Sequence, residues 1–563
     1  MDVLTCVGLA TLEVATARGI GITTSFATSQ VILIVFILHY FAIKYYRTYL
    51  YPKHFSPWRH LPTPQASRSF TAATSLRKLL LTLSQDNQFL VGQAIKIFKA
   101  DTPVSVFVKW MEQNPDAPFI RYLTFGNGEM LLVNSPSAHR EVLQANCYSF
   151  KKPDRFRRMI KQFAGEKSLA MLEFGEHRQH RKMLAGVFTP ANIRRLAPVF
   201  AAKAKEMHDL FDQAIASHDG KTGIIDCAHT YSKATLDAVG IAIFGVDLVQ
   251  TKNSAISGKL NDQYSFADAY EDLFAMDATG KVLLLLNSFI PIRWLPLKAN
   301  RQFLFAINWL DETLIGLVRD RRREISEAIA AGKYDKQSRD LLSFLVEESL
   351  PGGAAAGISD KHIADHLLVF MGAGHDSSAD MASWSTYIMA THPDIQDRLR
   401  SEVQNLVARS PEPTSTDIEV LPYLDNFFRE SLRMYPPGTT MHRQAIKDLT
   451  IQGVFIPEGS SLDMAPAVTS MNPLIWGDDA RKVRPDRWDK ATNEQLAVWS
   501  NNVFSNGPRI CIGKAFAQLE LKMMLFDIVR HYRFLGVEGS FTVENPALTL
   551  RPNGLKIRVE KIT

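Results

Sequence analysis

The sequence predicts a mainly α-helical domain with small peripheral β-sheets, preceded by one transmembrane helix. Three observations support this prediction. Most of the 563 residues follow helical periodicity. Two places in the chain show short strand patterns joined by turn residues. A stretch near the amino terminus, between Arg18 and Lys44, contains no Asp, Glu, Lys or Arg.

The uncharged stretch is most apolar over residues 31–43, where His39 is the main exception. A helix rises about 1.5 Å per residue, so residues 20–43 can cross a hydrocarbon core of about 30 Å. The chain begins Met1-Asp2 and lacks the basic region of a cleavable signal peptide, so we expect a retained anchor. Whether residues 3–17 form a second membrane segment stays open.

Basic and proline residues follow the anchor. The cations are Lys44, Arg47, Lys53 and Arg59, and the prolines are Pro52, Pro57, Pro62 and Pro64. The charge asymmetry places residues 1–19 in the lumen and the rest of the chain in the cytoplasm. Residues 44–65 are predicted to form a semi-rigid hinge. Residues 66–563 contain no long linker, repeat or low-complexity tract, so we expect one large domain there.

Two strand pairs are predicted at opposite ends of this domain. Residues 119–125 and 130–133 alternate around a glycine-containing turn. Residues 548–550 are expected to pair with residues 555–559 across the turn at 552–554. Most of the remaining chain has helical periodicity.

Composition excludes several classes of function. The net charge of +6 is mild and spread along the chain, so nucleic-acid binding is not expected. The chain shows no phosphate-binding loop and no G-x-G-x-x-G that opens a helix, so flavin and nicotinamide domains are not expected. Its four cysteines lack close spacing, which fits a reducing compartment.

The strongest motif is F-S-N-G-P-R-I-C-I-G at residues 504–513. A single cysteine in a glycine-bracketed loop that opens a helix suggests an axial thiolate for haem iron. The positive end of that helix would stabilise the Cys511 thiolate. Gly507 can supply the unusual backbone angles of a tight loop, and Gly513 lets the first helical turn approach a flat macrocycle.

Two further side chains of the loop fit the same chemistry. Phe504 would pack against the loop and keep water off the sulfur, and Arg509 is placed to hydrogen-bond a haem propionate. The alternative is a buried structural cysteine, which is the usual fate of a lone Cys. Five fixed positions favour the haem ligand.

The loop resembles the F-x-x-G-x-R-x-C-x-G haem loop of cytochrome P450 monooxygenases, followed by the family's alanine and acidic residue at Ala517 and Glu520. The resemblance implies the cytochrome P450 fold over residues 66–563. It also implies haem b as cofactor, with the sulfur of Cys511 as axial iron ligand, an arrangement that favours O–O bond cleavage.

The resemblance extends to E-S-L-R at residues 430–433. Glu430 and Arg433 lie three residues apart on one face of a helix that two prolines end. Arg487, in R-P-D-R-W, is expected to be the third member of a buried charge network behind the haem loop. A solvated helix pair is the commoner origin of E-x-x-R, but the order and spacing of the motifs favour the network.

The third family element is M-G-A-G-H-D-S-S at residues 371–378, within a helix expected between Ser359 and Pro393. Each glycine in a helix interior costs about 1 kcal/mol relative to alanine. The resemblance implies a distal helix that opens locally here, so that Ala373 and Gly374 line a groove for dioxygen. A small-residue packing site with a capping Asp is the alternative.

In the family, an acid and a hydroxyl of this motif relay protons to dioxygen, and these roles fall on Asp376 and Ser377. Serine stands where threonine is usual. It keeps the donor and the acceptor but lacks the methyl group that stiffens the side chain. We therefore expect a looser relay that wastes some reduced oxygen.

The haem propionates need counter-charges. The family's W-x-x-x-R helix corresponds to G-E-H-R-Q-H-R-K, so His177 and Arg181 are candidates, with His177 replacing tryptophan as a ring N–H donor. Arg443, in T-M-H-R-Q-A, is the third candidate. A basic run near His177 could otherwise be a solvated helix face.

Another histidine pattern has a different interpretation. His362 and His366 are four residues apart, which is zinc-ligand spacing. No glutamate follows His362 and no third ligand is evident. We therefore expect a surface pair.

Electrons must come from a partner protein. Five cations are expected on the thiolate side of the haem, at Arg481, Lys482, Arg484, Arg509 and Lys514. An acidic reductase could dock there, although solvated charges are the alternative. The resemblance implies NADPH–cytochrome P450 reductase as this partner, with cytochrome b5 as a second candidate.

Together these features predict a membrane-anchored monooxygenase of the endoplasmic reticulum, single-pass, with a cytoplasmic catalytic domain. It would insert one atom of dioxygen into a lipophilic small molecule lying near Ala373, Gly374 and residues 437–441. T-M-H-R resembles fungal enzymes of secondary metabolism. The alternatives are a reductase-independent isomerase or dehydratase on the same scaffold, and a non-catalytic haem carrier or sensor.

Overall fold

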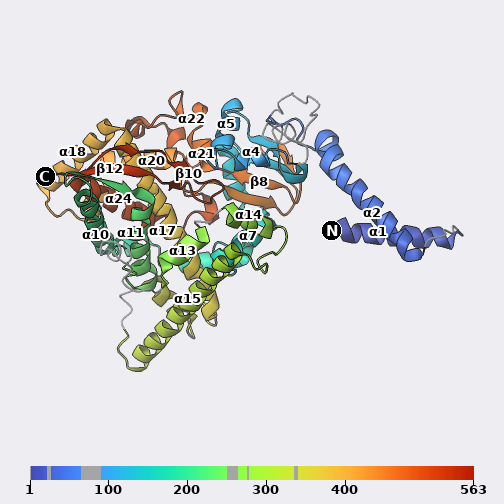
Figure 1. Cartoon of the computed structure of the whole chain (residues 1–563), viewed down its shortest axis with the longest axis horizontal. Helices are drawn as coiled ribbons and strands as arrows, with labels where there is room; N and C mark the ends of the chain where they lie inside the picture. Colours follow the sequence, from blue (N-terminus) through green and yellow to red (C-terminus); the bar gives the residue numbers. More distant parts are fainter. Residues whose placement is uncertain are drawn as a thin grey trace.

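The computed structural model describes residues 2–21, 27–64, 91–249, 251, 264–274, 278–334 and 340–562. Helices form most of the body, with small sheets at its margin, as the sequence predicts (Figure 1). The amino-terminal helices α1 and α2 extend away from this body (Figure 1). The expected domain from residue 66 begins in a segment, 65–90, that lies outside the described residues.

The amino terminus forms α1 (Asp2–Gly19), α2 (Thr28–Tyr45) and a π-helical continuation, η1 (Tyr46–Phe55). Among the described residues, Thr28–Phe55 is the one helix long and apolar enough to cross a membrane. This helix begins later and ends later than residues 20–43. Helix α1 packs beside α2, with Glu13 Oε1 3.2 Å from His39 Nε2.

The predicted proline-rich hinge contacts the body at several points. Residues up to Phe55 are helical, and Arg121 Nη2 donates to the carbonyl of Pro52 at 2.6 Å. The buried indole of Trp58 donates to the carbonyl of Phe455 at 2.8 Å. The Arg121 backbone N–H donates to the carbonyl of Pro62 at 2.9 Å. The described part of this segment is therefore attached to the peripheral sheet.

The largest sheet has the strand order β1-β2-β8-β5-β3. Its strands are β1 (Phe119–Leu123), β2 (Glu129–Val133), β3 (Phe150–Lys151), β5 (Met441–Ala445) and β8 (Ser461–Met464). A three-stranded sheet joins β4 (Thr222–Asp226), β12 (Lys556–Lys561) and β9 (Tyr532–Glu538). Two pairs complete the set: β6 (Leu449–Ile451) with β7 (Val454–Ile456), and β10 (Thr542–Val543) with β11 (Pro552–Asn553).

One predicted strand pair is confirmed and the other is wrong. Strands β1 and β2 pair antiparallel around the expected turn. Residues 548–550 do not pair with β12, because β12 lies between β4 and β9. The segment bonds elsewhere: the Leu550 N–H donates to the carbonyl of Pro437, and the Trp384 indole donates to the carbonyl of Leu550.

Helices form the core. The shorter ones are α4 (Ala94–Phe98), α5 (Ser105–Gln113), α6 (Pro136–Arg140), α7 (Asp154–Ala164), α8 (Phe174–Leu184), α9 (Pro190–Arg194), α13 (Phe266–Phe274), α14 (Ala278–Asn287), α16 (Leu341–Ser349), α19 (Ser415–Glu419), α20 (Pro422–Met434), α21 (Pro466–Ser470), α22 (Pro473–Trp476) and α23 (Asn493–Leu496). The longer ones are α10 (Ala197–Ala216), α11 (Cys227–Phe244), α15 (Lys298–Ala330), α17 (Asp360–Thr391), α18 (Pro393–Arg409) and α24 (Lys514–His531).

Helix α17 runs through the centre of the main core and packs against α11, α15, α20 and α24. Its ends match the sequence prediction. The Ser359 hydroxyl accepts the His362 N–H at 3.2 Å and caps the first turn, and the helix stops at Thr391, before Pro393. Helix α20 ends at Met434, before the expected prolines.

Candidate active site

Cys511 lies in the loop between the short turn Gly507–Arg509 and α24. Its backbone N–H donates to the carbonyl of Phe504 at 2.8 Å, which closes the loop. Gly507 has φ +70°, and a Cβ there would lie 2.2 Å from the carbonyl oxygen of Leu143. Only glycine satisfies both constraints, so this residue sets the shape of the loop.

The Cys511 thiol faces a cavity, in agreement with a role as a ligand. Burial raises the pKa of this thiol, while a hydrogen bond from Gly513 and the charges of Arg181 and Lys514 act in the opposite direction. The helix end therefore contributes as expected, through Gly513, the residue that caps α24. Bound iron would supply the further positive charge that a thiolate needs.

The cavity has a volume of about 920 Å³ and lies between the Cys511 loop and α17. Nearly every predicted cofactor residue lines it. These are His177, Arg181, Arg443, Phe504, Arg509, Cys511, Gly513 and Ala517, together with Ala373, Gly374 and Ser377 of α17. The motifs that are far apart in the sequence thus meet at one site.

Positive charge collects at one side of this cavity. Arg181, Arg443 and Arg509 line it together with Lys152, and Glu173 is the carboxylate that pairs with two of them. Glu173 Oε1 lies 3.1 Å from Lys152 Nζ, and Glu173 Oε2 lies 2.5 Å from Arg509 Nη2. Four cations facing one carboxylate leave a local excess of positive charge.

Burial is the main cause of the pKa shifts of these cations, and the neighbouring cations add to it. Burial, followed by the charge of Arg509, lowers the pKa of Arg443 to about 10. Burial lowers the pKa of Lys152 to about 8, although Glu173 opposes that shift. The Nε of Arg509 is buried without a hydrogen-bond partner. Anionic groups placed here would satisfy these donors and stabilise the cations.

His177 belongs to the same side of the cavity. Its side chain is buried, and its Nδ1 has no hydrogen-bond partner. Burial lowers the pKa of His177 to about 4, and the charges of Arg509, Lys152 and Arg181 add to this effect. The ring is therefore neutral at pH 7 and can donate one N–H to an anion.

Residues 371–378 of α17 form the opposite wall. The helix is continuous through this motif, so the local opening expected from the resemblance is not seen. The small residues Ala373 and Gly374 line the cavity instead, and the Ser377 hydroxyl donates to the carbonyl of Ala373 at 2.7 Å. A Cβ on Gly374 would lie 3.1 Å from Val239 of α11, which explains why this glycine is tolerated within the helix.

Asp376 does not line the cavity but contacts a residue that does. Its Oδ2 accepts the Thr549 hydroxyl at 2.8 Å, and Thr549 lines the cavity. Arg551 Nη1 lies 3.8 Å from its Oδ1. The structure thus connects the predicted acid to the cavity through Thr549.

A second polar connection leaves the cavity at Ser378. The Ser378 hydroxyl donates to Glu520 Oε2 at 2.7 Å. Burial raises the pKa of Glu520 to about 8, so this side chain is mostly protonated at neutral pH. The haem-loop motif identified Glu520, but the sequence did not indicate that Ser378 of α17 would be its partner.

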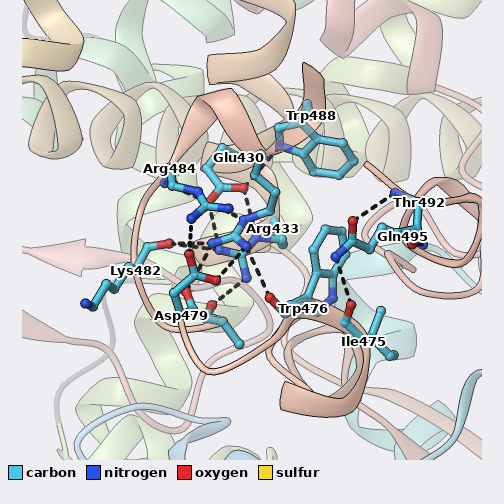
Figure 2. Close-up of polar contacts among 12 residues, drawn as sticks. Glu430, Arg433, Ile475, Trp476, Asp479, Lys482, Arg484, Trp488, Thr492 and Gln495 are labelled. Carbon is cyan, nitrogen blue, oxygen red and sulfur yellow. Dashed lines mark hydrogen bonds and ion pairs between the residues drawn. The ribbon is translucent and has the colours of Figure 1, made fainter. Parts of the chain in front are cut away.

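The E-x-x-R residues form a buried network of hydrogen bonds and ion pairs (Figure 2). Glu430 contacts Arg433 through two hydrogen bonds, at 2.7 and 2.9 Å, and neither side chain is exposed to solvent. Arg487 Nε lies 3.3 Å from Glu430 Oε1 and also pairs with Asp479 at 2.9 Å. The indole of Trp488, the aromatic residue of R-P-D-R-W, donates to Glu430 Oε2 at 3.1 Å and so joins the network.

One expectation about the surface cations is wrong. Arg509 is not part of an exposed basic patch, because its side chain is buried against Glu173. Arg481 and Arg484 pair with Glu112 and Asp479, so their charges are partly neutralised.

His362 and His366 are not a surface pair. His366 is fully buried, and His180 of α8 joins the two histidines. The Leu169 N–H donates to His366 Nδ1 at 3.2 Å, so the neutral ring carries its proton on Nε2 and donates to His180 Nδ1 at 3.1 Å. This chain of hydrogen bonds ties α8 to α17.

Sequence reasoning missed three residues of the site. Lys152 and Glu173 flank the propionate candidates, and Thr549 connects Asp376 to the cavity. None of them stands within a motif. Only the tertiary structure brings them to the cavity.

Comparison with known proteins identifies the family. The family model described as cytochrome P450 matches residues 84–559. The chain is similar to cytochrome P450 monooxygenase sphH of Aspergillus fumigatus, with 28% identity over 505 residues that cover 87% of this chain and 85% of the relative. It is also similar to monooxygenase FSL4 of Gibberella zeae, with 29% identity covering 90% and 88% of the two chains. Monooxygenase FUM15 of Gibberella moniliformis is 27% identical, covering 91% and 90%.

The chain therefore belongs to the cytochrome P450 family. The match spans most of its length, and these relatives are all named as monooxygenases. The protein is a haem-thiolate monooxygenase, as the sequence predicts.

Proposed function

We propose that this enzyme is a membrane-anchored monooxygenase that inserts one oxygen atom from dioxygen into a lipophilic small molecule. The second atom would leave as water, with electrons from NADPH. One observation carries the proposal: Cys511, an excess of buried cations and the small residues of α17 all face one cavity of about 920 Å³. A cavity that only stored or sensed haem would not need the α17 motif.

The residues present fit haem b. Cys511 would ligate the iron, and the loop residues Phe504, Gly507 and Gly513 would shape that side of the pocket. Arg181, Arg443, Arg509 and His177 would bind the propionates, which supply the two negative charges that this cluster lacks. When bound, haem supplies dioxygen binding, and its thiolate ligand favours O–O cleavage.

Proton supply falls to α17. The Ser377 hydroxyl lines the cavity beside Gly374 and can pass a proton from solvent-connected groups. Asp376 would be the acid that replenishes it, held in place by Thr549 and Arg551. The hydrogen bond between Thr549 and Asp376 supports a proton path on that side of the cavity, because Thr549 lines the cavity and Asp376 accepts from it.

The cavity favours an apolar substrate. Beyond the cation cluster, its walls are mainly aliphatic and aromatic, including Val187, Phe188, Val369 and Phe370. Pro437 and Gly438 border it at the turn that the sequence assigned to the substrate. A lipophilic molecule would gain about 25 cal/mol per Å² of apolar area buried there.

The remaining assignments follow from the family and the amino terminus. NADPH–cytochrome P450 reductase would deliver electrons, with cytochrome b5 as a second donor. Helix Thr28–Phe55 would anchor the enzyme in the endoplasmic reticulum in place of the expected span 20–43, with residues 1–19 lumenal and residues 66–563 as the cytoplasmic catalytic domain. The similarity to fungal monooxygenases fits a role in fungal secondary metabolism.

The test combines a spectrum with turnover. Cys511→Ala should abolish the characteristic absorbance of the reduced carbon-monoxide complex. In the wild-type enzyme with reductase, oxygenated product should form only when NADPH is consumed, and the NADPH consumed should equal or exceed the product because part of it yields peroxide. Product formed without NADPH would reject the proposal in favour of an isomerase or dehydratase, and an unchanged spectrum in Cys511→Ala would reject the ligand assignment.

A further inference from the structure

A second cluster of potential ligands lies away from the haem cavity, between α10 and α24. Asp527 and His531 stand four residues apart on α24, so their side chains share one face. His208 comes from α10, which packs against α24. One ligand atom from each of the three residues lies within 4.8 Å of the other two.

The distances suit a shared cation. His208 Nε2 lies 2.6 Å from Asp527 Oδ2, and one ring nitrogen of His531 lies within 4.8 Å of a ligand atom of each of the other two residues. The His208 and His531 rings have centroids 4.6 Å apart. Ligands at about 2.0–2.2 Å from one zinc ion are separated by about 3–3.5 Å, so small side-chain movements would suffice.

Hydrogen bonding prepares His531 for this role. Its Nδ1 donates to the backbone carbonyl of Asp527 at 2.9 Å, so the neutral ring keeps its lone pair on Nε2. Metal-binding histidines usually fix their second nitrogen in this way. The exposed fractions of the His208, Asp527 and His531 side chains are 18%, 24% and 34%, so an ion can reach them from solvent.

The surroundings are acidic. The Tyr532 hydroxyl donates to Asp212 at 2.8 Å, and the Tyr532 ring packs edge-on against His208 at 5.3 Å. Asp209 stands next to His208 in α10, and Asp212 lies one turn later on the same helix. Lys561 offsets one of these charges through Asp212. The remaining field favours a cation.

The His180, His362 and His366 cluster does not offer the same chemistry. Both ring nitrogens of His366 are already used, one by the Leu169 N–H and one by His180. Ligation through His366 Nε2 would require its proton to leave and the Leu169 bond to be lost. That cluster is therefore a hydrogen-bonded contact between helices. A histidine substitution there serves as the control for loss of a histidine outside the proposed metal site.

We propose that His208, Asp527 and His531 form a binding site for a divalent transition metal ion, with Zn²⁺ the best match and water completing the coordination. Two imidazoles and a carboxylate are a common donor set for such ions. The ion would link α10 to α24, the helix that starts at the Cys511 loop. This site is independent of the haem site and of the proposed monooxygenase function.

Zinc binding to the purified full-length protein tests the proposal. We expect one zinc ion per chain in competition with a chromophoric chelator, in addition to haem iron. His531→Gln and Asp527→Asn should each weaken zinc affinity at least tenfold. His218→Gln, at an exposed histidine just after α10, and His362→Gln should leave the affinity unchanged. Zinc should raise the thermal midpoint of the wild-type protein and of these two controls only.

Circular dichroism without zinc checks that each variant is folded. If either His531→Gln or Asp527→Asn does not fold, the other variant still tests the proposal. Wild-type protein that binds no zinc tighter than about 10 µM would overturn the proposal and leave a surface ion pair only. Loss of zinc in His362→Gln with full affinity in His531→Gln would overturn it as well.

Discussion

At the scale of single residues, serine at position 377 is the main departure from the family motif. Its hydroxyl donates to the carbonyl of Ala373, where it keeps the bond that a threonine would make. The side chain lacks the methyl group that would restrict its first torsion, so it can leave this position more easily. Proton supply should therefore be less tightly coupled to substrate oxidation than in a threonine enzyme.

The first prediction follows from this hydroxyl. Ser377→Ala removes a positioned proton donor, so we expect the ratio of hydrogen peroxide to oxygenated product to rise about tenfold or more. Ser377→Thr should lower the ratio below that of the wild type. The measurement is peroxide and product per NADPH consumed; an equal ratio in all three proteins would contradict the proposed role.

The second prediction concerns the charge of Glu430. Glu430→Gln leaves Arg433 buried without its counter-ion, so the free energy of unfolding should fall by about 3–5 kcal/mol. Asp320→Asn removes an exposed partner of Arg323 and should cost less than about 1 kcal/mol. Denaturant unfolding of both variants measures the difference, and equal losses would show that burial of the network contributes nothing.

At the scale of elements, the contact between α8 and α17 matters most. Helix α8 carries His177 and Arg181, and α17 carries the residues proposed to relay protons, Asp376 and Ser377. The hydrogen bond from His366 to His180 joins the two helices, and the His362 ring lies against both. The two walls of the cavity are thus held together by neutral histidines.

This contact predicts sensitivity to acid. Burial lowers the pKa of His366 to about 3, below its value of about 6.5 in the unfolded chain, so the unfolded state binds more protons between these pH values. Stability should therefore be full above about pH 6.5 and fall as the pH decreases, by at most about 1.4 kcal/mol per pH unit for this group. His180, His362, Asp365 and Lys167 are the nearest titratable groups.

His366→Gln provides the check. It keeps one hydrogen-bonding side chain but removes the titrating ring, so unfolding free energies measured from pH 7.5 to 5 should show a smaller slope than those of the wild type. His139 and His177, whose pKa values burial lowers to about 4, keep part of the slope. An identical slope in the variant would contradict this assignment.

The sequence predicted the features that depend on residues close together in the chain, and it failed for features that depend on tertiary contacts. The Cys511 loop, the cap at Ser359 and the end of α20 depend on residues close together in the chain, and local patterns predicted them. The failed expectations depend on tertiary packing. Leu550 bonds to Pro437 and Trp384 instead of pairing with a strand. His366 contacts His180 of α8. The spacing of residues in the sequence indicates neither contact.

At the scale of the whole molecule, the amino-terminal helices extend from a body that the connecting segment contacts closely (Figure 1). Arg121 and Trp58 attach this segment to the peripheral sheet and to β7. The catalytic domain should therefore fold without the anchor, provided that these contacts remain.

Deletion of residues 1–45 tests this independence. We expect the shortened protein to move from the membrane fraction to the soluble fraction while its thermal midpoint changes by less than about 4 °C, since about 1 kcal/mol or less is lost. Cell fractionation and thermal unfolding provide the measurements. A shortened protein that stays with membranes would show that another surface binds lipid.

The five-stranded sheet connects two distant functions. Its first strand, β1, carries Arg121, which donates a hydrogen bond to the carbonyl of Pro52. Strand β5, the fourth in the sheet order, carries Arg443, a proposed propionate partner. In the proposed enzyme, a short run of cross-strand bonds therefore connects a residue that would hold a haem propionate to the segment that follows the apolar amino-terminal helix.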